Sequence, residues 1–192
     1  VGHEGHPEVE GTMGRHINSD NSSIYLVQNE FDAKNVRINN PTKLALVTQT
    51  TLSVDETKSI IHILKHRFPD IDIPKKDDIC YATQNRQDAV KQLALESDFM
   101  IVVGSKNSSN SNRLSELAEK CGCRSILIDE FTDIDLDDLK NYSKISITAG
   151  ASAPESKVME IAKSLELHTD AEIIEHGEDN EDIYFKLPPG LR

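Results

Sequence analysis

The stretch Phe-Met-Ile-Val-Val-Gly-Ser-Lys-Asn-Ser-Ser-Asn, residues 99–110, joins a wholly apolar run to a strongly polar loop. Five consecutive apolar residues are typical of a strand that is buried on both faces of a parallel sheet. A helix is predicted after the loop because apolar residues recur there at helical spacing, and Gly122 is expected to cap its end. A strand, a polar loop and an amphipathic helix in this order predict a βαβ unit.

The same pattern recurs on both sides of this stretch. Further strands are predicted at residues 43–47, 79–83, 125–129 and 144–148, and further helices at 55–68, 89–94 and 158–165. The fold is therefore expected to be of the α/β class, built from repeated small domains with mostly parallel sheets.

A segment bounded by prolines, residues 69–76, is the expected boundary between two domains. It separates a first α/β domain, residues 1–76, from a second α/β domain, residues 77–176. Residues 177–192 are expected to form a C-terminal tail, in which residues 183–187 suggest a late strand or a docking arm.

The composition limits the kind of partner that the chain can bind. Its 192 residues include 33 Asp and Glu but only 21 Lys and Arg, which gives a formal net charge of −12. This charge argues against nonspecific nucleic-acid binding, which requires Lys and Arg against phosphate. No apolar run approaches the roughly 20 residues of a membrane helix. Three cysteines are too few for a disulfide framework, so a reducing compartment is expected.

Polar loops follow the predicted strands at the edge where open parallel sheets bind their ligands. They lie around Thr50, Cys80, residues 108–110 and Ser152, and each of them opens a helix. Helix N-termini offer free N–H groups and a positive dipole end, so these loops predict an anion site, most of all for phosphate. The simpler alternative is that their Ser, Thr and Asn residues only cap helices. No glycine-rich nucleotide fingerprint is present.

The opening segment, residues 5–12, places an imidazole and a carboxylate two positions apart. His6 precedes Pro7, which favours extended backbone, so His6 and Glu8 are expected to point to the same side. Such a pair suits anion binding combined with proton transfer. The alternative is a solvated loop. The chain begins at Val1, without Met and inside this motif, so we expect an N-terminal portion to be missing.

The three cysteines have different expected roles. Cys80 stands alone among polar residues at the end of a predicted strand, and it is a small buried hydrophobe, a thiolate nucleophile or a metal ligand. Cys121 lies on the apolar stripe of a predicted helix, and Cys123 follows the turn at Gly122. We expect these two to be structural.

Five stretches of the sequence together resemble a known family. They are Gly-His-Pro-Glu-Val-Glu-Gly-Thr (5–12), Thr-Gln-Thr-Thr-Leu-Ser-Val-Asp (48–55), Asp-Asp-Ile-Cys-Tyr-Ala-Thr (77–83), Gly-Ser-Lys-Asn-Ser-Ser-Asn-Ser (104–111) and Thr-Ala-Gly-Ala-Ser-Ala-Pro (148–154). In this order they are similar to the motifs of 4-hydroxy-3-methylbut-2-enyl diphosphate reductase, the last enzyme of the non-mevalonate isoprenoid pathway. The resemblance covers essentially the whole chain.

The resemblance implies three similar α/β domains, pseudo-symmetric around a central [4Fe-4S] cluster. It implies a two-electron reduction that removes the allylic hydroxyl of the substrate and gives isopentenyl and dimethylallyl diphosphates. Matched by motif, Cys80 resembles a cluster thiolate, Glu8 the proton donor to the leaving hydroxyl, and Thr50 a partner of that hydroxyl and of Glu8. The residues that resemble diphosphate ligands are His6, Ser108, Ser109, Asn110 and Ser152.

The family's other two cluster cysteines belong to an N-terminal domain that this sequence lacks. One thiolate cannot hold a [4Fe-4S] cluster, because each iron needs its own ligand. We therefore predict that the chain alone binds no stable cluster and has no reductase activity. Two other classes remain open: a non-catalytic phosphate-binding module that has lost the cluster, and a thiol hydrolase that uses Cys80 and His6.

The family also implies a partner and a location. Its electrons come from small ferredoxin- or flavodoxin-type carriers, and neither nucleic acid nor a membrane is expected as a partner. The expected location is a bacterial cytoplasm, or a plastid if a transit peptide precedes the chain.

Overall fold

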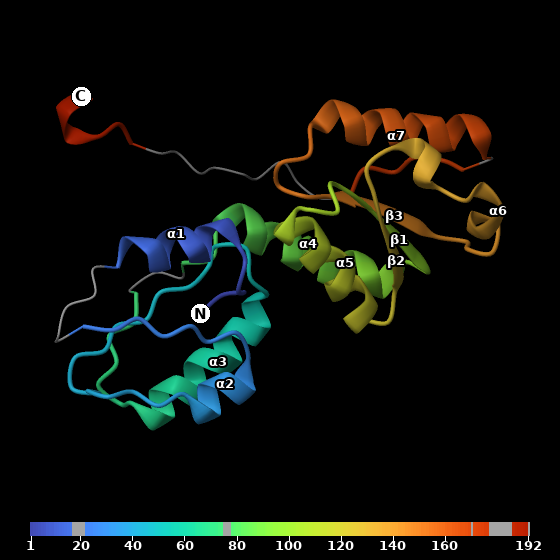
Figure 1. Cartoon of the computed structure of the whole chain (residues 1–192). Helices are drawn as coiled ribbons and strands as arrows, with labels where there is room; N and C mark the ends of the chain where they lie inside the picture. Colours follow the sequence, from blue (N-terminus) through green and yellow to red (C-terminus); the bar gives the residue numbers. More distant parts are fainter. Residues whose placement is uncertain (17–21, 75–77, 170, 177–185, 192) are drawn as a thin grey trace.

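The computed structural model of the protein describes residues 1–16, 22–74, 78–169, 171–176 and 186–191. Figure 1 shows its helices and strands in chain order, which are α1 (Pro7–Arg15), α2 (Glu30–Asn35), α3 (Val54–Arg67), α4 (Tyr81–Glu96), β1 (Phe99–Val103), α5 (Ser109–Lys120), β2 (Arg124–Ile128), η1 (Phe131–Asp133), α6 (Leu136–Leu139), β3 (Ile145–Ala149), α7 (Glu155–His168) and η2 (Pro189–Leu191).

The sheet has three parallel strands in the order β2-β1-β3. In the central strand, Ile101 lies opposite Ile126 on one side and Ile147 on the other. The predicted strands at 99–103, 125–129 and 144–148 are confirmed, each to within one residue, and so is the α/β class. A continuous apolar run identifies such strands well because both faces of the sheet are covered.

The two faces of β1 carry two separate cores. Side chains alternate along a strand, so Phe99, Ile101 and Val103 share one face while Met100 and Val102 share the other. All five are at most 1% exposed. The first face packs against α6 and α7, and the second face packs against α4 and α5. Figure 1 shows α7 on one side of the strands and α5 on the other.

This strand order places a topological switch point at the carboxyl ends of β1 and β3. The loop after β1 leads into α5 on one face of the sheet, and the loop after β3 leads into α7 on the opposite face. The two loops therefore diverge, and such a switch point is where open α/β sheets bind ligands. Residues 104–108 and 150–154 make up these two loops.

The N-terminal part is organised by helices rather than by a second sheet. Figure 1 shows α1, α2 and α3 beside the sheet-containing part, and α2 and α3 share a small apolar core. The predicted strand at 43–47 is wrong, because only the isolated bridge between Ala45 and Asp72 forms there. One bridge is not a ladder, and Val47 remains 55% exposed. Among the described residues, a parallel sheet thus occurs only once.

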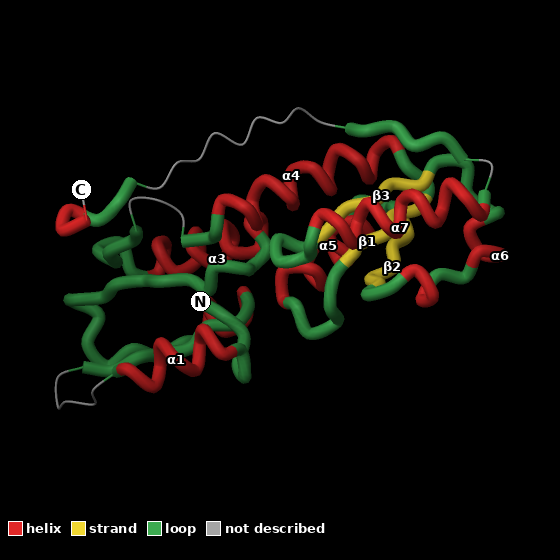
Figure 2. Tube along the Cα trace, turned by 90° about the horizontal axis from the view of Figure 1, so that it is seen from above, coloured by secondary structure: helices red, strands yellow, loops and turns green. Residues whose placement is uncertain are grey.

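The predicted strand at 79–83 is also wrong, because α4 begins at Tyr81 and Cys80 is its N-cap. Figure 2 shows α4 extending from beside α3 to the sheet. Its first buried positions are the polar residues Thr83 and Gln87, so apolar periodicity does not reveal the first turns. Gln87 is satisfied in the interior, where its amide group accepts from Val54 N at 3.0 Å and donates to the carbonyl of Leu52 at 2.9 Å.

The opening segment is helical from Pro7 onward, so the expected extended arrangement of His6 and Glu8 is wrong. His6 itself is extended, with φ −77° and ψ 131°, as a residue before proline should be. Proline, however, is well suited to the first position of a helix, because its missing N–H and fixed φ cost nothing there. Glu8 therefore lies in the first turn of α1.

The remaining helix predictions are confirmed by α3, α4 and α7, which contain the cores of the expected segments. Gly122 follows α5 with φ +87°, a conformation that favours glycine at a helix C-terminus. Most of the late strand expected at 183–187 lies outside the described residues. None of the helices in the described part is both long and apolar enough to span a membrane. The domain boundary at 69–76 remains a prediction.

Candidate functional site

Glu8 and Thr50 form the best-defined polar contact at the site. The Thr50 N–H donates to both carboxylate oxygens of Glu8, at 3.2 and 3.1 Å, and the Thr50 hydroxyl donates to Oε2 at 3.0 Å. The carbonyl of Thr50 accepts from Cys80 N at 2.9 Å. One residue therefore connects the first turn of α1 to the N-cap of α4.

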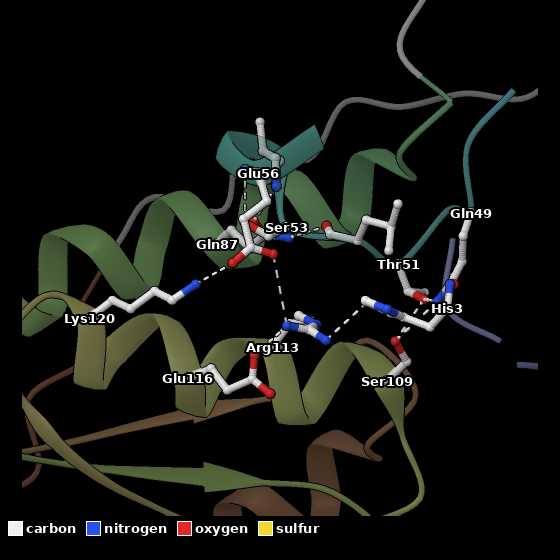
Figure 3. A network of polar contacts seen from close by, with 12 residues as sticks. His3, Gln49, Thr51, Ser53, Glu56, Gln87, Ser109, Arg113, Glu116 and Lys120 are labelled. Atoms are coloured by element: carbon white, nitrogen blue, oxygen red, sulfur yellow. Dashed lines mark hydrogen bonds and ion pairs between the residues drawn. The ribbon is translucent and has the colours of Figure 1, made fainter. Parts of the chain in front are cut away.

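A second set of contacts joins the same loop to α5. The Gln49 side chain, only 2% exposed, donates to the hydroxyls of Thr51 at 3.0 Å and Ser109 at 3.3 Å. The Thr51 hydroxyl also donates to that of Ser109 at 3.1 Å. Figure 3 shows these side chains converging on the start of α5. Residues 49–51 thus meet the first turns of α1, α4 and α5.

This convergence favours an anion. Each helix presents the positive end of its dipole and its unpaired N–H groups at the N-terminus. The first turns of α4 and α5 contain no Asp or Glu that could neutralise them. In α5 the Ser108 hydroxyl accepts from Ser111 N at 3.3 Å, so Ser108 caps the helix as the simpler interpretation expected.

The start of α5, beside the carboxyl ends of β1 and β3, holds buried polar atoms. Asn110 is 5% exposed and Ser111 is 1% exposed. Within the described residues, the Asn110 amide oxygen and nitrogen and the Ser111 hydroxyl have no hydrogen-bond partner. An unsatisfied buried polar group costs about 1–3 kcal/mol. Such a cost is unusual at a purely structural helix start and fits a place where polar ligand atoms bind.

Two glycines allow Ser111 to pack against the ends of β1 and β3. A Cβ on Gly104 would clash with the Ser111 hydroxyl and lie 2.9 Å from its Cβ, and a Cβ on Gly150 would clash with the same hydroxyl. The ends of β1 and β3 therefore close directly on the start of α5. Asn110 lies beside Gly150, which brings the loop that carries Ser152 next to residues 108–110.

The other predicted residues are less enclosed. His6 accepts from Glu8 N through Nδ1 at 3.3 Å, which leaves Nε2 as the ring nitrogen available to a ligand. Ser152 is exposed in the loop before α7. Among the described residues, neither its hydroxyl nor the Cys80 thiol forms a hydrogen bond to another predicted site residue.

The three cysteines lie in different environments, and one of the predictions for Cys80 is wrong. Cys80 is exposed at the start of α4, so its interpretation as a buried hydrophobe is wrong. Cys123 is buried and Cys121 packs against the same core, which confirms their structural role. Burial raises the pKa of the Cys123 thiol. In the part of the chain that the structure describes, no three His, Cys, Asp or Glu side chains are placed to hold a metal ion.

A separate cavity of about 380 Å³ lies between α1 and the segments 23–27 and 43–49. Its walls are mostly apolar, and Glu8 alone among the predicted site residues lines it. The residues predicted to bind a diphosphate do not line this cavity.

Comparison with known proteins shows the family to which the chain belongs. A model of the LytB protein family matches residues 1–166. The chain belongs to the LytB protein family. This membership confirms the resemblance to the reductase family, because relatives that carry the reductase name match the chain throughout.

The relatives of this LytB chain are longer than the chain itself. It is 54% identical over 192 residues to the 4-hydroxy-3-methylbut-2-enyl diphosphate reductase of Saccharophagus degradans, and 50% identical to that of Idiomarina loihiensis. The match covers 100% of this chain but only 62% and 61% of those proteins. The chain thus spans about three fifths of the length of the curated relatives it matches.

A solved structure supports the fold of the LytB chain. The E-1-hydroxy-2-methyl-but-2-enyl-4-diphosphate reductase of Plasmodium falciparum superposes with a TM-score of 0.78 at 35% sequence identity. The superposition covers 85% of this chain and 50% of that one.

Four residues at the site of the LytB chain were not singled out from the sequence. Gln49 and Thr51 flank Thr50 inside a quoted motif, so their position was a usable signal. His3 and Arg113 meet across the fold, 110 residues apart, and no local pattern indicates their contact.

Proposed function

We propose that this chain is the diphosphate-binding and proton-donating part of a 4-hydroxy-3-methylbut-2-enyl diphosphate reductase. The reaction replaces the allylic C–OH of the substrate by C–H, with two electrons and two protons, and releases water. The observation that carries the proposal is the pair of contacts that Thr50 makes, with the carboxylate of Glu8 and with the backbone N–H of Cys80. It joins the proposed proton donor, the proposed hydroxyl ligand and the proposed metal ligand within one site.

The proposed diphosphate site lies at the carboxyl ends of β1 and β3. Ser108, Ser109 and Asn110 are at the N-terminus of α5, where backbone N–H groups and the helix dipole attract phosphate. The unpartnered amide of Asn110 supports a direct contact with a phosphate oxygen. His6 Nε2 and the exposed Ser152 hydroxyl complete the proposed donors. These groups bind the diphosphate and leave the allylic end of the substrate to Glu8 and Thr50.

The proposed role of Glu8 is to hand a proton to the leaving hydroxyl. The Thr50 N–H and hydroxyl fix the orientation of the carboxyl group through three contacts. With Glu8 protonated, its O–H can be donated to Thr50 Oγ or to a substrate hydroxyl in the same position. Thr50 thus orients both partners of the proton transfer.

The described residues do not by themselves fit a [4Fe-4S] cluster, because Cys80 is the one cysteine at the site. We propose that the remaining thiolates come from residues outside this chain, and that the electrons come from a ferredoxin- or flavodoxin-type carrier. The bacterial relatives support a cytoplasmic location. The single thiolate also favours a second function for the isolated chain, namely diphosphate binding without catalysis.

The proposed function is tested in a chimera that joins the upstream region of the Saccharophagus degradans relative to this chain. After anaerobic reconstitution with iron and sulfide, we expect the chimera to oxidise a reduced carrier only when (E)-4-hydroxy-3-methylbut-2-enyl diphosphate is present, and to form both isopentenyl and dimethylallyl diphosphate. The 192-residue chain treated in the same way is expected to be inactive. A chimera that binds a full cluster and the substrate but forms neither product would contradict the proposal.

A further inference from the structure

Arg113 lies at the junction between α5 and the N-terminal part of the chain. It follows Ser109 by four positions, so both side chains lie on the same face of α5. Its Nη2 contacts His3 Nε2 at 3.0 Å. Its Nη1 pairs with Glu116 of the same helix and lies 4.0 Å from Glu56 of α3. Figure 3 shows the guanidinium between these three partners.

The contact with Arg113 fixes the state of His3. A guanidinium group only donates hydrogen bonds, so His3 Nε2 must be the unprotonated acceptor. Partial burial, and then the positive charge of Arg113, hold the pKa of His3 below its ordinary value of 6.5. Glu56 and Glu116 act in the opposite direction, and His6 adds to the lowering. The net lowering of the His3 pKa favours the neutral ring that the contact with Arg113 requires.

His3 is tied to α5 by two routes. Its ring contacts Arg113, while its backbone N–H donates to Gln49 Oε1 at 3.1 Å, and Gln49 in turn donates to Ser109. The two routes end at Arg113 and Ser109, which are about one helical turn apart on α5. Together they hold the first turn of the helix against residues 49–51.

We propose that Arg113 is a positioning residue that holds the first turn of α5, with Ser109 and Asn110, in the geometry that binds a diphosphate. This inference rests on the proposed function. The guanidinium is engaged with three partners and its side chain is only 21% exposed, so it acts through α5 rather than as a diphosphate ligand. The planar fork of arginine can serve several acceptors at once, which a lysine ammonium cannot do in the same geometry.

Lys120 provides a matched control. It pairs with Glu56, a partner that it shares with Arg113, from the last residue of the same helix. Its side chain is 58% exposed, compared with 21% for Arg113. An exposed pair of this kind contributes little. Removal of Lys120 therefore changes the charge of α5 without releasing its first turn.

The positioning should weaken at low pH. Because the pKa of His3 in the folded protein lies below its ordinary value, the contact is fully present above about pH 6.5. It is lost as the pH falls through the lowered pKa, when His3 becomes a cation beside Arg113. In His3→Gln, the amide oxygen can accept from Arg113 at every pH, so this variant should not lose the contact.

The test uses the 192-residue chain with inorganic diphosphate as the probe, titrated between pH 5 and pH 8. At pH 8 we expect Arg113→Gln and Arg113→Lys to weaken binding about tenfold, and Lys120→Gln to change it less than about twofold. The ratio of the wild-type and Arg113→Gln affinities cancels the titration of diphosphate itself. We expect this ratio to shrink toward one at pH 5, whereas the ratio between His3→Gln and Arg113→Gln stays constant.

Hydrogen exchange without ligand separates this inference from the proposed function. The amides of residues 110–112 should exchange about ten times faster in Arg113→Gln than in the wild type at pH 8, and at the wild-type rate in Lys120→Gln. If the wild-type chain does not bind diphosphate, the proposed site is wrong. The exchange rates still test, in that case, whether Arg113 holds the first turn of α5. Unchanged exchange, or full rescue of diphosphate binding by lysine, would overturn the positioning role.

Discussion

Glu8→Gln in the chimera is expected to lower turnover by about a hundredfold to ten-thousandfold while leaving the affinity for the allylic diphosphate nearly unchanged. Glutamine keeps an oxygen that can accept from the Thr50 N–H and hydroxyl, so the loop and α1 should stay in place. It has no acidic proton to give to the leaving hydroxyl. The loss should therefore appear in turnover rather than in binding.

The control for this prediction is Glu10→Gln. Glu10 lies in the same helix, is exposed and carries the same charge. Its substitution should leave turnover within about twofold, since exposed substitutions away from the site have small effects. Equal turnover in Glu8→Gln and the wild type would remove Glu8 from the role of proton donor. Equal losses in both variants would point to the charge of α1 instead.

The second large effect is expected at Cys80. Cys80→Ser in the chimera should abolish the stable [4Fe-4S] cluster, because serine replaces the one thiolate that the described part of the chain offers at the site. Iron and sulfide analysis together with visible absorbance would measure the loss. The unmodified 192-residue chain should likewise retain no stoichiometric cluster.

Cys121→Ser is the matched control for cluster binding. Cys121 packs against the core between α4, α5 and β1 and is not at the site. Its replacement should lower stability modestly and leave the iron content of the chimera unchanged. If Cys80→Ser kept a full cluster, or if the chain alone bound one as a monomer, the metal-ligand role of Cys80 would be wrong.

The sheet was predictable from sequence where strands are buried on both faces. The run from Phe99 to Val103 is wholly apolar and lies at the centre of the sheet, so no other structure suits it as well. The run at 43–47 looks similar, but its backbone pairs through one bridge only. Whether an apolar run becomes a strand depends on the neighbour available, which local sequence does not specify.

The first turns of helices were harder to predict because they contain mainly polar residues, which show no apolar periodicity. Residues 79–83 have strand-like composition, yet the buried Gln87 and the N-cap position of Cys80 belong to α4. His6 is extended, as the residue before a proline is expected to be. Proline also favours the first position of a helix, however, so α1 begins at Pro7 and Glu8 is helical.

The site residues that lie within short sequence motifs were predictable from the sequence, whereas contacts between distant segments were not. Glu8, Thr50 and Ser109 lie within short motifs, and the fold brings them into one connected set. The contact between His3 and Arg113 joins segments 110 residues apart and depends on the docking of α5. Such long-range partners follow from tertiary packing alone.

The most direct test of a shared diphosphate site is an amide-shift titration of the 192-residue chain with inorganic diphosphate. We predict saturable shifts at residues 49–51, 108–111 and 150–152 with one common affinity, and a loss of about tenfold or more in Asn110→Ala. Shifts confined to a single helix start, or different affinities at the three segments, would contradict a shared diphosphate site.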